Sequence, residues 1–257
     1  MLNFRNTNII FIGLLIGMIG YDILHELPFY WYIIAGIIYS LLLFRGSYYV
    51  GSNFYFHIIC AADTDKKQLA ITFDDGPVKE FTPKVLEILK EYDAPAAFFC
   101  IGKRVHENPA LLKQVYADGH LIGNHSYSHD TWFDLFSASK MTGDLKAMDE
   151  AMQTVIGKKP RLFRPPYGVT NPNLKKAVMN GKYIPVGWNI RSLDTVITDE
   201  HQLLAKVTKA LKPGAVVLFH DTASAIPAVL PAFIRYARNN GYEIVRLDKL
   251  LNLEAYE

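Results

Sequence analysis

The sequence predicts an α/β domain built on a parallel sheet, preceded by a pair of apolar N-terminal helices. From Leu69 onward in this 257-residue chain, strand-like apolar runs alternate with helical stretches. Such alternation favours parallel strands joined by right-handed crossovers, in either an open doubly wound sheet or a barrel. Polar residues fall where several of the predicted strands end, which is the face that carries the active site in barrel folds.

Length, charge and cysteine content narrow the class of protein. The chain is long enough for one large domain with a substantial core. Its formal net charge is +2, so nothing in the composition points to nucleic acid as a partner. Two cysteines, Cys60 and Cys100, form neither a zinc-type pair nor a disulfide framework that can be read from the sequence.

Two uncharged apolar runs mark the N-terminus, from Asn6 to Tyr21 and from Leu27 to Phe44. Each approaches the roughly 20 residues that a membrane-spanning helix needs. Tyr30-Trp31-Tyr32 opens the second run, as expected of an interfacial aromatic belt. A cleaved signal peptide is the alternative for the first run, although no small-residue cleavage site follows it. A buried helix pair in a soluble protein is the other alternative.

We therefore expect a transmembrane hairpin over residues 1–45, a connector over 46–67 and the α/β domain over 68–257. Arg5 and Arg45 flank the hairpin, whereas its short central connection contains no Lys or Arg. The positive-inside rule then places both ends of the hairpin, and the domain with them, on the cytoplasmic side.

The elements after the hairpin follow in order along the chain. Within the connector, Phe54–Cys60 predicts an extra strand. Seven apolar runs are predicted as strands: Leu69–Phe73, Pro95–Ile101, His120–Asn124, Leu162–Arg164, Tyr183–Asn189, Ala215–Phe219 and Tyr242–Leu247. Six stretches are predicted as helices: Pro83–Tyr92, Pro109–Ala117, Ser139–Ile156, Pro172–Asn180, Glu200–Leu211 and Ile226–Asn239. Asn108 and Asn171 each precede a proline, as an N-cap precedes the first helical position.

Two adjacent carboxylates, Asp74 and Asp75, follow the first strand on a Gly-Pro turn. In isolation this pattern is ordinary turn chemistry. A later serine-rich loop adds His125 and His129, and neutral imidazoles are common ligands for zinc and similar metals. Two histidines with Asp75 leave a coordination position open for water and substrate, and Asp74 is then available as a general base.

Arg164 ends another strand and can hold Asp74 ionised through charge-assisted hydrogen bonds; a purely structural ion pair is the alternative. The rigid Pro165-Pro166 pair can aim the backbone N–H of Tyr167 at a developing oxyanion.

His220 follows an apolar strand and can protonate a leaving amine. Asp194 can orient and charge that imidazole, or it can be an ordinary loop carboxylate. The whole inventory fits metal-assisted hydrolysis of an acyl group. We interpret the other five histidines as surface or packing residues: His25, His57, His106, His120 and His201.

Taken in order, four segments resemble motifs of the NodB-like polysaccharide deacetylases, carbohydrate esterase family 4: Ile71–Pro77, His125–His129, Arg164–Gly168 and Leu218–Asp221. The family has five motifs, and the remaining one, the fourth in chain order, corresponds to the segment ending at Asp194. The resemblance covers roughly residues 68 to 250. It implies a distorted (β/α) barrel with about seven parallel strands. It also implies hydrolysis of the acetamide of an N-acetylated sugar, releasing acetate.

The resemblance also assigns roles by position. It implies a divalent metal, with Zn²⁺ the first expectation and Co²⁺, Mn²⁺ or Ni²⁺ as alternatives, held by Asp75, His125 and His129. It implies a catalytic set of Asp74 as base, His220 as acid, Arg164 and Asp194. It places Tyr167 in the third motif and Leu218 in the lining of the acetyl pocket, and we expect Trp188 and Arg191 to complete the substrate-binding set.

The fourth motif departs from the family at two positions. Members often have Asp where this chain has Arg191, and Trp where it has Thr195. Losing the Trp removes an apolar wall beside the acetyl group, and Arg191 can instead meet an acidic group on the substrate.

The sequence therefore predicts a membrane-anchored, metal-dependent deacetylase of N-acetylglucosamine-type units. The alternatives are another amide or O-acetyl ester hydrolase on the same metal site, or an inactive membrane-tethered glycan-binding relative. The family resemblance favours an envelope glycan outside the cell, whereas the charges favour the cytoplasm and a soluble or lipid-linked precursor.

Overall fold

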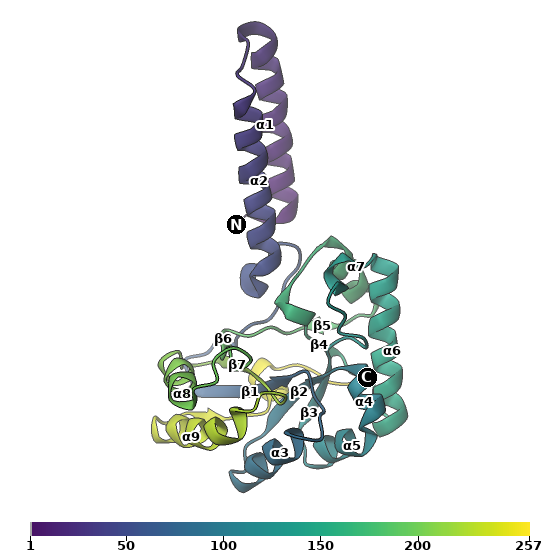
Figure 1. Cartoon of the computed structure of the whole chain (residues 1–257), viewed down its shortest axis with the longest axis vertical. Coiled ribbons are helices and arrows are strands. Elements are labelled where there is room, and N and C mark those ends of the chain that lie inside the picture. The colour runs from purple at the N-terminus through teal and green to yellow at the C-terminus, as the bar shows by residue number, and fades with distance from the viewer. Residues whose placement is uncertain (1) are drawn as a thin grey trace.

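A computed structural model describes residues 2–257; Met1, which falls in the predicted anchor, lies outside the described residues. A helical hairpin of α1 (Phe4–His25) and α2 (Tyr30–Tyr48) projects from an α/β domain (Figure 1). The two helices contact each other along their length. Phe11 stacks on Tyr39 with ring centroids 4.1 Å apart, and the Tyr39 hydroxyl donates a 2.7 Å hydrogen bond to Asn8.

Both hairpin helices are long and apolar enough to cross a membrane. Their large apolar side chains are exposed: Ile16, Ile23 and Phe44 expose 66%, 78% and 65% of their surfaces. A helix pair in the core of a soluble protein would bury such side chains, which these helices do not.

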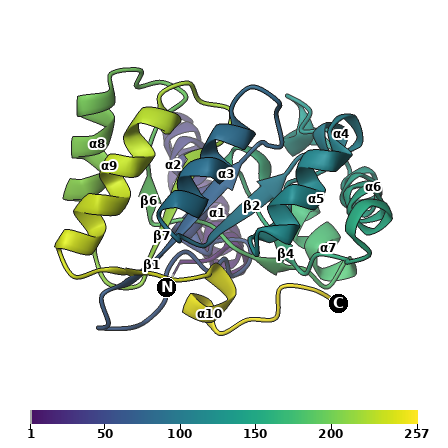
Figure 2. The same cartoon turned by 90° about the horizontal axis from the view of Figure 1, so that it is seen from below.

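The domain is built on one sheet in which the pairings are parallel and the strand order is β5-β4-β3-β2-β1-β7-β6, with β8 also pairing with β1. The strands are β1 (Gln68–Asp74), β2 (Ala96–Cys100), β3 (Leu121–Asn124), β4 (Leu162–Phe163), β5 (Ile184–Pro185), β6 (Ile190–Arg191), β7 (Ala215–His220) and β8 (Glu243–Ile244). The sheet curls into a half-barrel with helices outside it (Figure 2). The predicted distorted barrel of parallel strands is confirmed.

The domain helices alternate with these strands. They are α3 (Thr82–Glu91), α4 (Gly102–Glu107), α5 (Pro109–Ala117), α6 (Ala138–Ile156), α7 (Pro172–Asn180), α8 (Glu200–Lys209), α9 (Ile226–Asn239) and α10 (Leu247–Leu251). Three short 3₁₀ turns are η1 (Val50–Ser52), η2 (Phe133–Leu135) and η3 (Pro166–Gly168). The bounds predicted for α5, α7 and α9 agree at both ends. The predicted N-cap of α7 forms a side-chain hydrogen bond, because Asn171 Oδ1 accepts the N–H of Leu174 at 2.8 Å.

Alternation along β1 separates the core from the interior of the half-barrel. Leu69, Ile71 and Phe73 are fully buried in the layer between the sheet and the outer helices. The intervening Thr72 and Asp74 point the other way, since successive strand residues face opposite sides. A polar stripe thus runs inside the half-barrel toward the carboxyl end of β1.

Three predicted strands differ from the structure. The run Tyr242–Leu247 forms a strand only at Glu243–Ile244, and Leu247 begins α10. Phe54–Cys60 is not a strand; in the described residues, the β-pairing of the connector is limited to isolated bridges from Ile59 to Val186 and from Ala61 to Ala215. The side chain of Asn53 accepts the N–H of Ile58 at 2.8 Å, which curls this segment into a turn.

The run predicted as one strand over Tyr183–Asn189 forms a strand only at Ile184–Pro185, with one isolated bridge from Val186 to Ile59, and a separate short strand, β6, begins at Ile190. Pro185 has no N–H to donate to a ladder. The carbonyls of Val186 and Gly187 are taken by the Arg164 side chain instead of by a neighbouring strand.

We expect Tyr183→Phe to lower the free energy of unfolding by about 1–3 kcal/mol, because a buried acceptor loses its donor. The Tyr183 hydroxyl donates a 2.6 Å hydrogen bond to Asp149, which also accepts from Asn124. Tyr236→Phe is the matched control, since that ring is 43% exposed, and should stay within about 0.5 kcal/mol. Urea unfolding of both variants measures the difference; equal values would contradict the role of this network.

Candidate active site

The sequence-predicted site residues meet around one cavity of about 250 Å³ at the carboxyl ends of the central strands. The lining residues are Asp74, Asp75, His125, His129, Tyr167, Gly168, Trp188, Arg191, Thr195, Leu218 and His220. Arg164 and Asp194 stand behind this wall, each buried and hydrogen-bonded to a residue that lines it. The structure therefore brings together all eleven residues that the sequence singles out.

Asp75, His125 and His129 form a group with metal-ligand spacing. One ligand atom from each lies within 4.8 Å of the others. His125 Nε2 and His129 Nε2 are 3.6 Å and 3.4 Å from the same Asp75 oxygen. Two imidazole nitrogens and one carboxylate oxygen are a donor set that suits zinc and similar divalent ions, with positions left for water and substrate.

The tautomer of His125 is set by its surroundings. Its Nδ1 is 2.9 Å from the carbonyl oxygen of Arg164, which can only accept, so Nδ1 carries the proton. Nε2 is then unprotonated and carries a lone pair on the side of Asp75, as in a metal-ligating histidine. Burial lowers the pKa of His125 to about 3, helped by repulsion from His129, so the ring stays neutral.

The histidine loop is held by residues that the sequence did not single out. Asp144 of α6 accepts the N–H groups of Tyr127 and Ser128 at 2.7 Å and 3.2 Å. The side chain of Asn124 accepts the N–H of Ser126 at 2.8 Å. Asp144 lies 15 or more positions from the loop in a helix of mixed polarity, so no local pattern marks it.

The loops that carry Asp75 and the two histidines also have unusual backbone conformations. Asp75, Ser126 and His129 have φ of 78°, 66° and 44°, a region that non-glycine residues seldom occupy. Such strain persists where surrounding contacts fix it, and it concentrates at functional sites.

Asp74 is buried beside this group and paired with Arg164. Arg164 Nη1 donates a 2.7 Å hydrogen bond to Asp74 Oδ1, while Asp74 Oδ2 lies 3.9 Å from His125 Nε2. Burial raises the pKa of Asp74, and the positive charge of Arg164 opposes that rise. One carboxylate oxygen is therefore anchored and the other faces the cavity.

His220 faces the cavity from the end of β7 and is backed by Asp194. Its Nδ1 is 2.7 Å from Asp194 Oδ1, and its backbone N–H donates to the other oxygen at 2.7 Å. Burial alone would lower the pKa of His220, but the hydrogen bond and charge of Asp194 outweigh it and raise that pKa to about 9. The imidazole is therefore protonated at neutral pH and able to donate from Nε2.

Asp221 packs against Gly76 of the first motif, and the sequence did not assign it a role. It is fully buried and accepts a 2.6 Å hydrogen bond from Thr82. Burial raises the pKa of Asp221 to about 7. A Cβ at Gly76 would lie 2.0 Å from its Oδ2, so only glycine fits beside this carboxylate.

Aromatic and apolar groups line the rest of the cavity. Tyr167 packs on His129 with ring centroids 4.6 Å apart, and Gly168 lies so close to Trp188 that a Cβ would be 2.6 Å from its ring. The guanidinium of Arg191 lies 5.8 Å from the Trp188 ring centroid at the exposed edge. Leu218 contributes an apolar surface.

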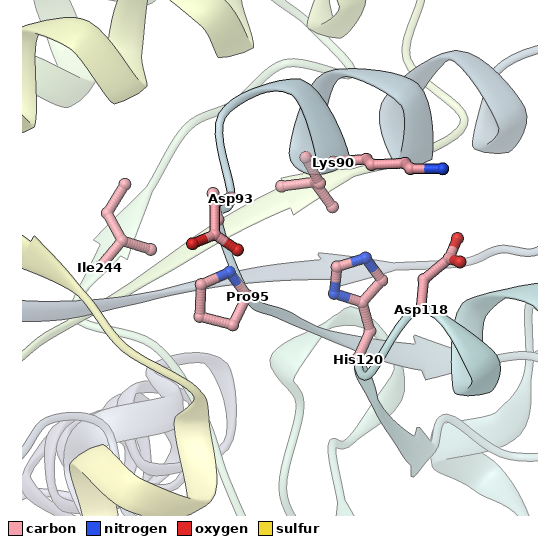
Figure 3. Close-up of a pocket in the computed structure, with 8 residues that line it drawn as sticks. Lys90, Asp93, Pro95, Asp118, His120 and Ile244 are labelled. Atoms are coloured by element: carbon pink, nitrogen blue, oxygen red, sulfur yellow. The ribbon is translucent and has the colours of Figure 1, made fainter.

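A second cavity, of about 550 Å³, lies at the opposite ends of the strands and holds one imidazole, His120 (Figure 3). That ring has a structural role: its Nδ1 accepts the N–H of Ala96 at 3.2 Å. Burial lowers the pKa of His120 to about 4. The interpretation of His120 as a packing residue agrees with this environment.

Comparisons with known proteins agree with the geometry. A family model described as polysaccharide deacetylase matches residues 61–184. A peptidoglycan-N-acetylglucosamine deacetylase from Bacillus cereus is 36% identical over 196 residues, which is 73% of this chain and 89% of that protein.

Solved structures share the fold. The peptidoglycan N-acetylglucosamine deacetylase Bc1960, in complex with 4-naphthalen-1-yl-N-oxidanyl-benzamide, is 27% identical with a TM-score of 0.73, covering 78% of this chain and 95% of that one. The pseudoenzyme BA3943 of carbohydrate esterase family 4, from Bacillus anthracis, is 27% identical with a TM-score of 0.69, covering 75% and 68%.

The extent of the match to the Bacillus cereus deacetylase, together with the half-barrel fold and the assembled motifs, leads to one conclusion. This chain belongs to the NodB-like polysaccharide deacetylases, carbohydrate esterase family 4.

Proposed function

We propose that this protein is a metal-dependent deacetylase that removes acetyl groups from N-acetylglucosamine-type units. Its family makes it a polysaccharide deacetylase, a hydrolase of non-peptide carbon–nitrogen bonds. One observation carries the metal-dependent mechanism. A ligand group of Asp75, His125 and His129 lies in one small cavity with an Arg-anchored carboxylate and a protonated histidine.

The residues present fit a divalent ion. The donor set is one carboxylate oxygen and two neutral imidazole nitrogens, and the second nitrogen of His125 is tied to a backbone carbonyl. When bound, such an ion supplies Lewis acidity that polarises the acetamide carbonyl and lowers the pKa of water. Asp75, His125 and His129 would hold it.

The protein groups then divide the proton transfers. Asp74 Oδ2 faces the cavity and takes the proton of the attacking water, since its other oxygen is occupied by Arg164. His220 donates its Nε2 proton to the departing amine, and Asp194 keeps that imidazole charged and oriented. The backbone N–H of Tyr167, fixed in the η3 turn, is the protein donor for the oxyanion.

The lining indicates how a sugar would sit. Leu218 and Trp188 provide apolar surface for the acetyl methyl group, which compensates in part for Thr195 in place of a Trp. Arg191 stands at the exposed edge, where the free guanidinium would meet a carboxylate or phosphate on a neighbouring unit. An acidic group next to the N-acetylated unit is therefore the substrate feature that we propose.

The likeness to a pseudoenzyme keeps an inactive glycan-binding role as the second candidate. A different amide or O-acetyl ester hydrolase on the same metal site is the third. Acetate release from acetylated chito-oligosaccharides, measured together with the metal content, separates these functions. Metal without acetate release from amide or ester substrates would favour the inactive relative.

We also propose that residues 1–45 anchor the enzyme in a membrane, with 46–67 as the connector and 68–257 as the catalytic domain. The exposed apolar surface of both helices supports this division. Arg5 and Arg45 at the domain end of the hairpin support the cytoplasmic side, and a soluble or lipid-linked glycan precursor is the corresponding substrate. The peptidoglycan deacetylases among the relatives support the envelope side and a wall glycan instead.

The two neighbouring aspartates should separate by role. We expect Asp74→Asn to keep metal binding while the rate falls by about 10²–10⁴-fold, because a general base is lost. Asp75→Asn, like His125→Ala or His129→Ala, should lower metal affinity itself. Zinc titration with acetate-release kinetics measures both effects, and chelation should abolish the wild-type activity. Equal metal loss in the two aspartate variants would show that this division is wrong.

The pH profile should be bell-shaped, and Asp194 should set its basic limb. His220 must be protonated to act as an acid, so activity falls as pH rises through its folded-state pKa of about 9. Asp194→Asn removes the interaction that raises this pKa, so the basic limb should move to lower pH. The exposed Asp65→Asn is the control. A basic limb that does not move in Asp194→Asn would show that His220 does not set it.

Protease added to intact cells or spheroplasts tests the topology. If the positive-inside rule holds, the catalytic domain should resist digestion until the membrane is lysed. Digestion without lysis would overturn the cytoplasmic placement and make a wall polymer the leading substrate.

A further inference from the structure

A basic cavity of about 540 Å³ lies at the base of the hairpin, separate from the catalytic cavity. Its walls come from the first turn of α1, the connector near Phe54, and α7. Figure 1 shows α7 beside the domain end of the hairpin. Three of its lining residues are cations, Arg5, Lys175 and Lys176.

No acidic residue balances these cations. The cavity lining contains no Asp or Glu, and within residues 2–257 none of the three cations forms an ion pair. Three like charges gathered around one cavity repel one another, and they create a positive potential that an anion relieves. The charge of this lining therefore favours an anion over a neutral or cationic ligand.

The position along the hairpin indicates where that anion comes from. Helix α1 has 22 residues, which at a rise of ~1.5 Å each span roughly 33 Å. That length matches a hydrocarbon core of about 30 Å, so Arg5 in the first turn lies at the level of the lipid headgroups. Tyr48 and Tyr49, at the same end of the hairpin, expose 63% and 57% of their surfaces, as interfacial aromatic residues do.

The cavity also has an apolar side. Phe4 and Phe54 contribute to its wall, and Met179 of α7 exposes 66% of its surface beside the two lysines. A small soluble anion has no apolar part that could cover this surface. The glycerol and upper acyl region of a lipid can cover it and bury it from water.

Backbone hydrogen bonds connect the cavity to the segment that carries Tyr167. The N–H of Phe4 donates to the carbonyl of Phe54 at 2.9 Å. The N–H and hydroxyl of Thr170 donate to the carbonyls of Ser47 and Gly46 at 3.0 Å and 3.2 Å. Thr170 lies in the chain between Tyr167 of the catalytic cavity and the start of α7, so these hydrogen bonds link the hairpin to the segment that connects the two cavities.

We propose that this cavity binds the phosphate of an anionic phospholipid headgroup in the leaflet on the side of the domain. Arg5, Lys175 and Lys176 contact the phosphate, and the lipid fixes the domain against the bilayer with the catalytic cavity at a set height above it. The proposal rests on the membrane anchoring proposed above, and it does not depend on the metal chemistry.

The test uses the full chain in nanodiscs of phosphatidylcholine with or without phosphatidylglycerol, with retained lipids counted by native mass spectrometry. Wild type should retain phosphatidylglycerol in preference to phosphatidylcholine. The double variant Lys175→Gln/Lys176→Gln should lose that preference. The control Lys206→Gln/Lys209→Gln, on helix α8, removes the same charge from another surface and should keep it.

The proposal would be overturned if the α7 variant retained as much phosphatidylglycerol as the wild type does. Displacement of the lipid by inorganic phosphate at equal concentration would also overturn it, because the site would then recognise a free anion. A chain that fails to enter nanodiscs would refute the anchoring and this proposal together. Acetate release from a soluble chito-oligosaccharide by the α7 variant, at the wild-type rate, shows that this variant is folded and tests the catalytic proposal separately.

Discussion

The fully buried guanidinium of Arg164 is the interaction on which the site depends. It donates to Thr72 and Asp74 on β1 and to the carbonyls of Val186 and Gly187 on the opposite wall. Desolvating such a charge costs several kcal/mol unless a partner and further hydrogen bonds compensate, and here both are present. The same residue accepts His125 Nδ1–H through its main chain. One residue thus connects β1 to the segment after β5, anchors the proposed base and holds a proposed metal ligand in place.

Each carboxylate of the site has different partners. Asp74 is tied to a cation, Asp75 faces two imidazoles, and Asp194 backs a third imidazole. Acid–base chemistry needs groups whose environments push their proton affinities in opposite directions. His125 and His220 show that division, because burial keeps the first neutral and Asp194 keeps the second protonated.

Much of the fold and site could be predicted because the signals were local. Alternating runs and proline-flanked caps located the principal strands and helices, and each motif lay at the end of a strand. The rest depended on contacts between distant segments. Asp144 supports the histidine loop from a helix, with no distinctive residues around it in the sequence. Asp221 lies within a recognisable motif, but its contact with the turn at Gly76 is visible only in the structure. The break after Pro185 arises because Arg164 takes two carbonyls that a strand ladder would otherwise use. The roles of the site residues, unlike their positions, remain predictions.

Anomalous X-ray diffraction at the zinc edge, from crystals of the zinc-loaded protein, tests the central claim most directly. The account predicts one anomalous peak within ligand distance of Asp75 Oδ, His125 Nε2 and His129 Nε2. It also predicts that Asp74 stays bonded to Arg164 and outside the coordination sphere. A peak ligated by Asp74, with its bond to Arg164 broken, or a peak at another place in the chain, would contradict the assignment of Asp74 as the free base.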